Sequence, residues 1–231
     1  MAVITINAEF GSRGILIAQK LAEELGYFYF DHIIAEEIAN LIKVKKIDVK
    51  KFEEEKHENI LATISKFFSI DIFKLKKHEP LKEKEVYEKL YSRNIKDSYK
   101  HLLPYRFEPH GWIDADVYKK MLYKVIQSLA KTENCIIVGR GGNIILSEHP
   151  NSYHFRFVAG KEFRRKTLIE IKGVPENEVD KLMEKVDKKA YNYNKYYFNF
   201  DINDPHYYTA VLNVEKLKED GTVNWIKKLI Q

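Results

Sequence analysis

The sequence contains one cysteine and no long hydrophobic run. A single cysteine, Cys135, cannot form a disulfide within the chain, and its apolar neighbours at 136–138 indicate a packing role in a core. No apolar run reaches the roughly 20 residues of a membrane span. Residues 1–6 carry no basic segment ahead of their apolar residues, so we expect no signal peptide. These absences favour a cytoplasmic protein that does not associate with membranes.

The sequence also lacks a dominant charge and a metal-ligand pattern. The net charge is +5, and the lysine-rich runs between residues 43 and 85 are interleaved with glutamates. Such mixing is typical of a solvated helix face, so we expect no nucleic-acid partner. The 8 histidines show no metal-ligand spacing, and we expect no structural metal. With 45% hydrophobic residues, the 231 residues suit one α/β domain, with or without an insertion.

Short apolar runs alternate with helical periodicity along much of the chain. Strands are expected at residues 3–6, 27–30, 135–138, 153–158 and 209–214. Helices are expected before Gly26 and at residues 118–129, 161–172, 175–193 and 222–230. Alternation of this kind indicates a three-layer α/β fold, in which helices flank a parallel sheet. The stretch at about 32–111 is helical in pattern, and we interpret it as an insertion into a single domain covering 1–231.

Two glycine-containing loops follow expected strands. The first, residues 9–14, joins a strand to a helix, the arrangement in which loop amides and a helix N-terminus bind phosphate. It departs from the P-loop pattern G-x-x-x-x-G-K-[ST], because Gly14 stands at the lysine position and Ile15 at the Ser/Thr position. Arg13 is the cation that this loop offers. A strand-turn-helix without a ligand is the alternative.

The second loop is Gly139-Arg140-Gly141-Gly142, after the apolar run 135–138. Ligands of open α/β sheets bind at the carboxyl ends of the strands, where this loop is expected to lie. Arg140 is therefore our strongest candidate for a phosphate or base contact. The alternative is a structural arginine paired with a carboxylate.

Several segments together resemble the cytidylate kinase-like family, in the same order along the chain. They are Ile-Thr-Ile-Asn-Ala-Glu-Phe-Gly-Ser-Arg-Gly at 4–14, the helix and strand at 17–31, Cys-Ile-Ile-Val-Gly-Arg-Gly at 135–141, the charged and tyrosine-rich segment 184–197, and Leu-Asn at 212–213. The resemblance is weakest at 42–114. It implies a P-loop NTPase-type sheet, an NMP-binding-type helical insertion at about 32–111 and a lid at about 173–200.

The resemblance also implies roles for individual residues. The ATP-binding positions would be Phe10, Gly11, Ser12, Arg13, Gly14, Ile15 and Arg164. The acceptor-binding positions would be Asp31, Gly139, Arg140 and Gly141. The cations acting in catalysis would be Arg13, Arg140, Lys188 and Lys189. Mg²⁺ would accompany ATP as a cofactor without a dedicated protein metal site, and helping to position it would be the other role for Asp31.

Each of these roles has a structural alternative. Asp31 can cap a helix beginning near His32, and Arg164 and the lid lysines can belong to solvated helix faces. The tyrosines at 191–197 can stack a base or simply pack. The family usually has arginine at the Ala8, Ile15 and Lys189 positions, and lysine lacks the planar fork with which arginine binds phosphate.

The sequence therefore predicts an ATP-dependent phosphotransferase of the nucleoside monophosphate kinase type. Small nucleotides would be its partners, and CMP or dCMP the favoured kind of acceptor; a homodimer is left open. One alternative is a nucleotide-binding or regulatory protein whose catalysis has weakened, because the P-loop lysine and Ser/Thr are missing. Another is a kinase for a different small acceptor, because the insertion that would select the acceptor is the least family-like part.

Overall fold

The computed structural model describes residues 2–31, 115–132 and 134–230. Contacts divide the chain into two units, Met1–Asp31 with Ile126–Gln231, and His32–Val125. The insertion expected at about 32–111 lies outside the described residues. Within the described ranges, no helix combines the length and the hydropathy that crossing a membrane requires.

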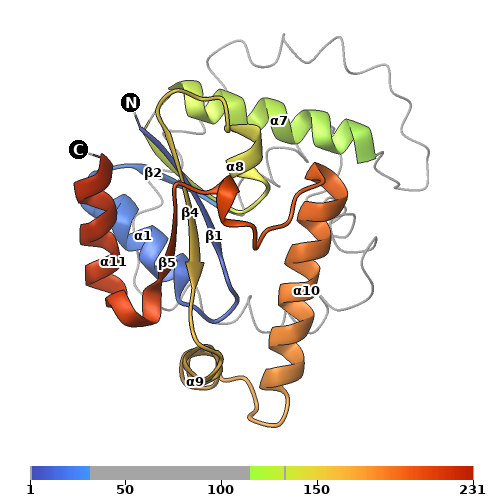
Figure 1. Cartoon of the computed structure of the whole chain (residues 1–231), viewed down its shortest axis with the longest axis vertical. Helices are drawn as coiled ribbons and strands as arrows, with labels where there is room; N and C mark the ends of the chain where they lie inside the picture. Colours follow the sequence, from blue (N-terminus) through green and yellow to red (C-terminus); the bar gives the residue numbers. More distant parts are fainter. Residues whose placement is uncertain (1, 32–114, 133, 231) are drawn as a thin grey trace. The chain divides into compact units, whose positions relative to one another are not determined.

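The first unit is built on a five-stranded parallel sheet (Figure 1). Its strands are β1 (Val3–Ala8), β2 (Phe28–Phe30), β3 (Cys135–Val138), β4 (Ser152–Val158) and β5 (Ala210–Asn213). They lie side by side in the order β2-β3-β1-β4-β5. The parallel sheet predicted from the alternation of elements is confirmed. In Figure 1 the carboxyl end of β4 points down, and α9 lies just beyond it.

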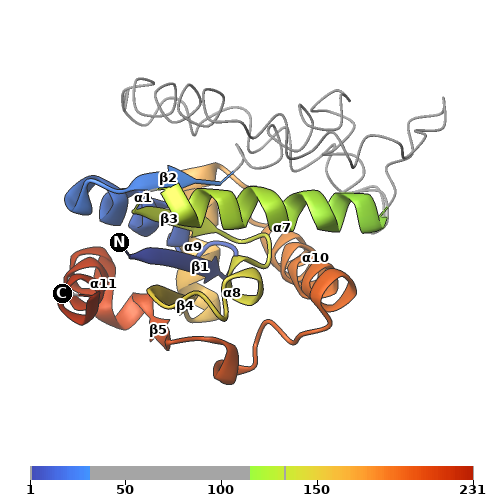
Figure 2. The same ribbon diagram turned by 90° about the horizontal axis from the view of Figure 1, so that it is seen from above.

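Helices cover both faces of this sheet (Figure 2). The helices of this unit are α1 (Gly14–Leu25), α8 (Gly142–Ile145), α9 (Lys161–Lys172), α10 (Val179–Phe198) and α11 (Val214–Ile230), with a 3-10 turn η2 (Pro205–Tyr207). Helix α7 (Ala115–Thr132) runs across the boundary between the two units. The helices α1 and α11 pack side by side on one face, and α8 lies on the other.

Several helix boundaries differ from the prediction, and α7 extends beyond 118–129 at both ends. Helix α10 begins at 179 rather than 175 and continues to 198 rather than 193. The segment α11 is kinked at Lys218 (φ 60°, ψ 172°), so a short helical stretch beginning at 214 precedes the closing helix that was predicted at 222–230. Helix α8, with 4 residues, was not predicted, since one turn is too short to show a helical repeat.

The face of the sheet beneath α1 and α11 is apolar. Ile4 and Ile6 of β1 point to this face and are fully buried together with Phe155 and Phe157 of β4. Helix α1 adds Ile17, Ala18 and Leu21, one stripe at helical spacing. This layer is the core that fixes where β1 ends and α1 begins.

The opposite face carries polar side chains. Thr5 and Asn7 alternate with the apolar residues of β1, and the neighbouring strand places His154 and Arg156 in register with them. The Thr5 hydroxyl lies 2.8 Å from His154 Nδ1, and the Asn7 amide donates to Asn143 Oδ1 of α8 at 3.1 Å. Central parallel strands are usually apolar on both faces, so this layer needs hydrogen bonds to be stable.

The hydrogen bonds of His154 define its tautomer. Ser152 Oγ lies within hydrogen-bond distance of the carbonyls of Leu146 (2.9 Å) and His149 (2.8 Å). Its one proton goes to a carbonyl, so Ser152 Oγ accepts from His154 Nε2–H at 3.2 Å. Nδ1 is then the acceptor from Thr5. Burial lowers the pKa of His154 to about 4, and the ring is neutral at pH 7.

We expect His154 to make stability fall with acidification. The unfolded state binds a proton as the pH drops below about 6.5, whereas the folded state resists protonation until about pH 4. The free energy of unfolding should therefore decrease between these pH values, by at most about 1.4 kcal/mol per pH unit. Urea unfolding at several pH values measures the slope of the free energy of unfolding against pH.

The variant His154→Gln should remove this part of the slope, although its stability at pH 7 should also be lower. His206→Gln is the matched control, because the His206 side chain is 90% exposed. A slope unchanged in His154→Gln would show that His154 is not the group responsible.

Candidate functional site

The loops that follow β1, β2 and β3 lie at one edge of the sheet, the carboxyl edge. The loop after β1 contains residues 9–13, and the loop after β3 contains residues 139–141. Asp31 directly follows β2, and its carboxylate accepts from the Tyr29 hydroxyl at 3.5 Å. The backbone N–H of Gly139 donates to the Ile6 carbonyl at 2.9 Å and ties the second loop to β1. The sequence-predicted donor and acceptor loops are therefore neighbours.

The first loop is a compact turn pressed against α9. The Glu9 N–H donates to the Phe157 carbonyl at 3.0 Å, and the Ser12 N–H donates to the Glu9 carbonyl at 3.1 Å. Gly11 has φ +83°, and a Cβ there would stand 2.8 Å from the Arg164 carbonyl. This position therefore requires glycine for both its backbone conformation and its close contact.

Helix α1 presents its N-terminus at this loop. Arg13 occupies the N-cap in a left-handed conformation (φ 63°), without a side-chain cap. The first helical bond of the segment runs from Ile17 N–H to the Arg13 carbonyl at 3.1 Å. The amides of residues 14–16 precede it and have no partner within the helix. A turn that leads into amides not used by the helix itself is suited to an anion.

The Arg13 side chain is directed at α9 and α11. Its Nη1 lies 3.0 Å from Glu219 Oε1, and its Nε donates to Thr167 Oγ1 at 3.3 Å. Its guanidinium carbon also lies 5.3 Å from the centre of the Phe163 ring. Through these contacts, Arg13 connects the start of α1 to α9 and α11.

A different arginine lies at the loop itself. Arg164 of α9 is 8% exposed and donates through Nε to the Phe10 carbonyl at 2.7 Å. Its Nη1 is 3.5 Å from Glu9 Oε2, and its Nη2 forms a short ion pair with Asp187 of α10. The second oxygen of Asp187 accepts from the Phe10 N–H at 3.3 Å. Because Arg164 is buried, it does not belong to a solvated helix face.

The second loop presents Arg140 between two glycines. Gly139, Arg140 and Gly141 all have positive φ, at 72°, 59° and 67°. The Phe198 ring, at the end of α10, lies where a Gly141 side chain would be: a Cβ would stand 2.3 Å from it. Arg140 is half-buried, at the carboxyl edge where the sequence predicted it.

Beneath this loop lies a polar network that sequence reasoning missed. Asn143 is 1% exposed and receives the Asn7 amide, which also lies 3.3 Å from the Tyr208 hydroxyl. The Tyr208 hydroxyl donates to the Ile202 carbonyl at 2.8 Å, and burial raises the pKa of Tyr208 to about 12. The signal in the sequence was Asn7, a polar residue inside an apolar strand.

Helix α10 carries the two predicted lid lysines and the aromatic cluster. Lys188 is exposed, and Lys189 is half-buried. Tyr197 is 3% exposed and lies 4.9 Å, ring centre to ring centre, from both Tyr193 and Tyr196. These contacts support packing as the role of most of the cluster; Tyr196, at 51% exposure, is its most open member.

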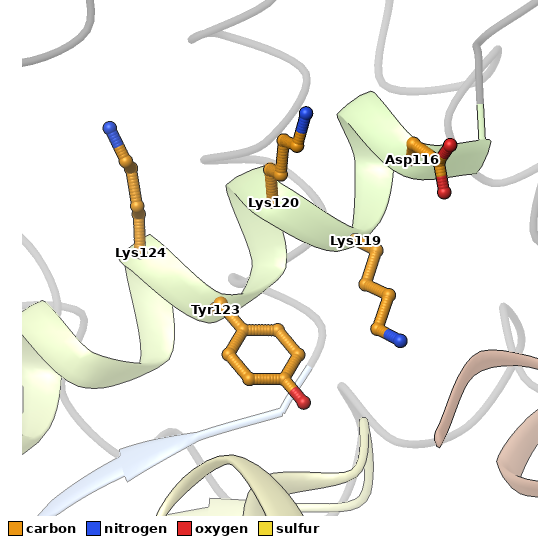
Figure 3. Close-up of a pocket in the computed structure, with 5 residues that line it drawn as sticks. All are labelled: Asp116, Lys119, Lys120, Tyr123 and Lys124. Atoms are coloured by element: carbon orange, nitrogen blue, oxygen red, sulfur yellow. The ribbon is translucent and has the colours of Figure 1, made fainter. Parts of the chain in front are cut away.

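A separate hollow of about 450 Å³ lies along α7 (Figure 3). It is lined by Asp116, Lys119, Lys120, Tyr123 and Lys124. Lys120 and Lys124 extend to one side of the helix, whereas Lys119 and Tyr123 extend to the other. These five residues all belong to α7. In the part of the chain described, no three His, Cys, Asp or Glu side chains meet as metal ligands.

The model of the cytidylate kinase-like family matches residues 3–216. The chain belongs to this family. The family match covers both loops and α10, and it confirms the resemblance drawn from the sequence motifs. This cytidylate kinase-like protein is accordingly a P-loop-type kinase in fold and family. Neither the match nor the fold identifies the acceptor.

The chain is similar to solved structures at low sequence identity. An uncharacterized protein from Eubacterium ventriosum is 21% identical, with 100% of this chain and 98% of that chain covered and a TM-score of 0.61. Shikimate kinase from Bacteroides thetaiotaomicron is 11% identical, with 99% and 98% covered and a TM-score of 0.45. No curated protein matches the sequence.

The contact between Gly141 and Phe198 predicts a difference between two glycine substitutions. Gly139→Ala places a Cβ in open space and adds the cost of a left-handed alanine, about 1–2 kcal/mol. Gly141→Ala has the same backbone cost and also forces the Phe198 ring to move, a further 1–3 kcal/mol or so. Urea unfolding of both variants measures the difference.

The pair Gly141→Ala with Phe198→Ala separates the two costs. Gly141→Ala should lower the free energy of unfolding no more than Gly139→Ala does when Phe198 is already alanine, because the added Cβ clashes with the Phe198 ring. If Gly139→Ala and Gly141→Ala lower the free energy of unfolding equally, the Phe198 ring does not pack on the loop.

Proposed function

We propose that this protein is an ATP-dependent phosphotransferase of the nucleoside monophosphate kinase type, with CMP, dCMP or a similar monophosphate as acceptor. One observation carries the proposal: in a chain of this family, a phosphate-type loop at a helix N-terminus lies beside a second loop that presents Arg140. Phosphoryl transfer requires a donor phosphate and an acceptor side by side, and this edge of the sheet provides both positions.

On the donor side, ATP phosphates bind backbone N–H groups of the first loop and of the first turn of α1, within residues 10–15. The amides at the start of α1 and the positive end of its dipole both favour a phosphate there. The loop needs no lysine to form these hydrogen bonds. A cation is nevertheless needed beside the transferred phosphoryl group, because negative charge accumulates on this group in the transition state.

On the acceptor side, Arg140 binds the monophosphate and Asp31 orients the nucleotide. Gly139 and Gly141 give the backbone its left-handed turn, so that the Arg140 side chain stands at the carboxyl edge. Lys188 and Lys189 of α10 supply positive charge from the lid. Because lysine binds phosphate through one point charge rather than a planar fork, the lid should stabilise the transition state less than an arginine lid would.

Magnesium enters this proposal with ATP. The P-loop position that normally offers a hydroxyl to Mg²⁺ is Ile15. The Glu9 carboxylate accepts from the Ala159 N–H at 3.0 Å, and both Glu9 and Asp187 pair with Arg164. These two carboxylates are therefore engaged by Arg164, and we propose that the phosphates and water hold the ion, with Asp31 orienting either the acceptor or the water shell of the metal.

A second candidate function is a nucleotide-binding protein with weak or no catalysis. Its support is that Arg13 is engaged with Glu219 and Thr167, and that the Arg164 charge is matched by carboxylates. A third is a kinase for another small acceptor. Its support comes from the sequence, since the segment at about 32–111 is the least family-like part.

Formation of ADP from Mg-ATP, measured with each ribo- and deoxyribonucleoside monophosphate in turn, tests the proposal. We expect turnover with a cytidine monophosphate. Arg140→Ala should lower kcat/KM by about 100-fold, because it removes a charged hydrogen-bond donor to the phosphate. Arg165→Ala is the matched control: this arginine lies on α9 and pairs with Glu176 and Asp180, away from both loops.

The outcomes separate the three candidates. Turnover that Arg140→Ala abolishes and Arg165→Ala preserves supports the proposal. Nucleotide binding without turnover favours the binding protein. ATP turnover only with an acceptor outside the nucleotide panel favours the third candidate.

A further inference from the structure

Asp187 of α10 behaves as an anion bound at the first loop. One of its carboxylate oxygens accepts the Phe10 N–H at 3.3 Å, and the other pairs with Arg164 Nη2. A backbone amide and a guanidinium that share one oxyanion group form a two-sided anion site. The carboxylate that occupies it comes from 177 residues further along the chain.

The geometry points to this site as a nucleotide phosphate site: we propose that Asp187 occupies the place of a phosphate between Phe10 N–H and Arg164, and that ATP displaces it. This inference rests on the proposed function, since it takes the loop to be where ATP phosphates bind. It identifies Arg164 as the cation that takes over the role of the missing P-loop lysine.

The balance of charge supports displacement rather than joint binding. Two carboxylates, Glu9 and Asp187, face the one guanidinium of Arg164, so the group has a surplus of one negative charge. A phosphate that entered beside Asp187 would meet this surplus at close range. After Asp187 leaves, the Arg164 charge is available to the phosphate, and the Phe10 N–H regains an acceptor.

The placement of the two side chains also fits an exchange. Arg164 is held in the interior, at 9% side-chain exposure, by its bond to the Phe10 carbonyl, so it remains at the loop. The Asp187 side chain is 38% exposed and can turn into solvent. The mobile member of the pair is therefore the carboxylate, and ATP binding is coupled to a rotation of the Asp187 side chain away from the loop.

The variant Asp187→Asn tests the exchange, because it keeps the size of the side chain and removes its charge. Binding of ATP and of inorganic tripolyphosphate, measured by calorimetry, should tighten by roughly 3- to 10-fold. Asp180→Asn is the matched control: Asp180 lies on the same helix and pairs with Lys161 (3.1 Å) and Arg165 (3.5 Å) of α9. It should leave both affinities unchanged.

A measurement on the unaltered protein covers the case in which Asp187→Asn does not fold. In nuclear magnetic resonance spectra, tripolyphosphate should shift the Phe10 amide and the Arg164 guanidinium signals. The Asp187 carboxylate carbon should shift in the same titration.

The outcomes distinguish the inference from the function on which it rests. If the unaltered protein binds ATP but Asp187→Asn binds it no more tightly, or the three signals do not move, the exchange is wrong and the proposed function stands. If neither protein binds ATP or tripolyphosphate, the loop is no phosphate site, and both are wrong.

Discussion

The buried guanidinium of Arg164 is the interaction on which the site depends. It connects α9, where it originates, to the Phe10 carbonyl of the loop and to Asp187 of α10. A charge at 8% exposure is costly unless its donors are satisfied, and removing one partner of such a pair typically costs 3–5 kcal/mol or so. The loop conformation and the position of α10 are therefore set together by one side chain.

The sheet supports this arrangement through its two unlike faces. The apolar face fixes β1 against α1, so the loop between them begins and ends at defined points. The polar face buries Thr5 and Asn7, whose partners are His154 and Asn143. Hydrogen bonds of this kind are directional, so they place α8, and with it the Arg140 loop, more narrowly than apolar packing would.

Sequence reasoning identified the elements whose signals are local. The parallel sheet followed from alternating periodicities, and the Arg140 loop from an apolar run ended by glycines. The contacts of Asp187 could not be predicted, because they join residues 177 positions apart and depend on the final packing. The direction of Arg13 was equally hidden, since its partner Glu219 lies on a helix whose periodicity is broken at Lys218.

Helix α10 touches both loops of the site, and this gives the two predicted ligand positions a physical connection. Asp187 meets the first loop at Phe10, and Phe198 meets the second at Gly141. The two contacts are 11 residues apart on one 20-residue helix, a separation of about 16 Å along its axis. A helix is stiff along its axis, so these two contacts together fix how α10 lies against both loops. The donor loop and the acceptor loop are therefore positioned by the same helix, and a change in the packing of α10 would be felt at both.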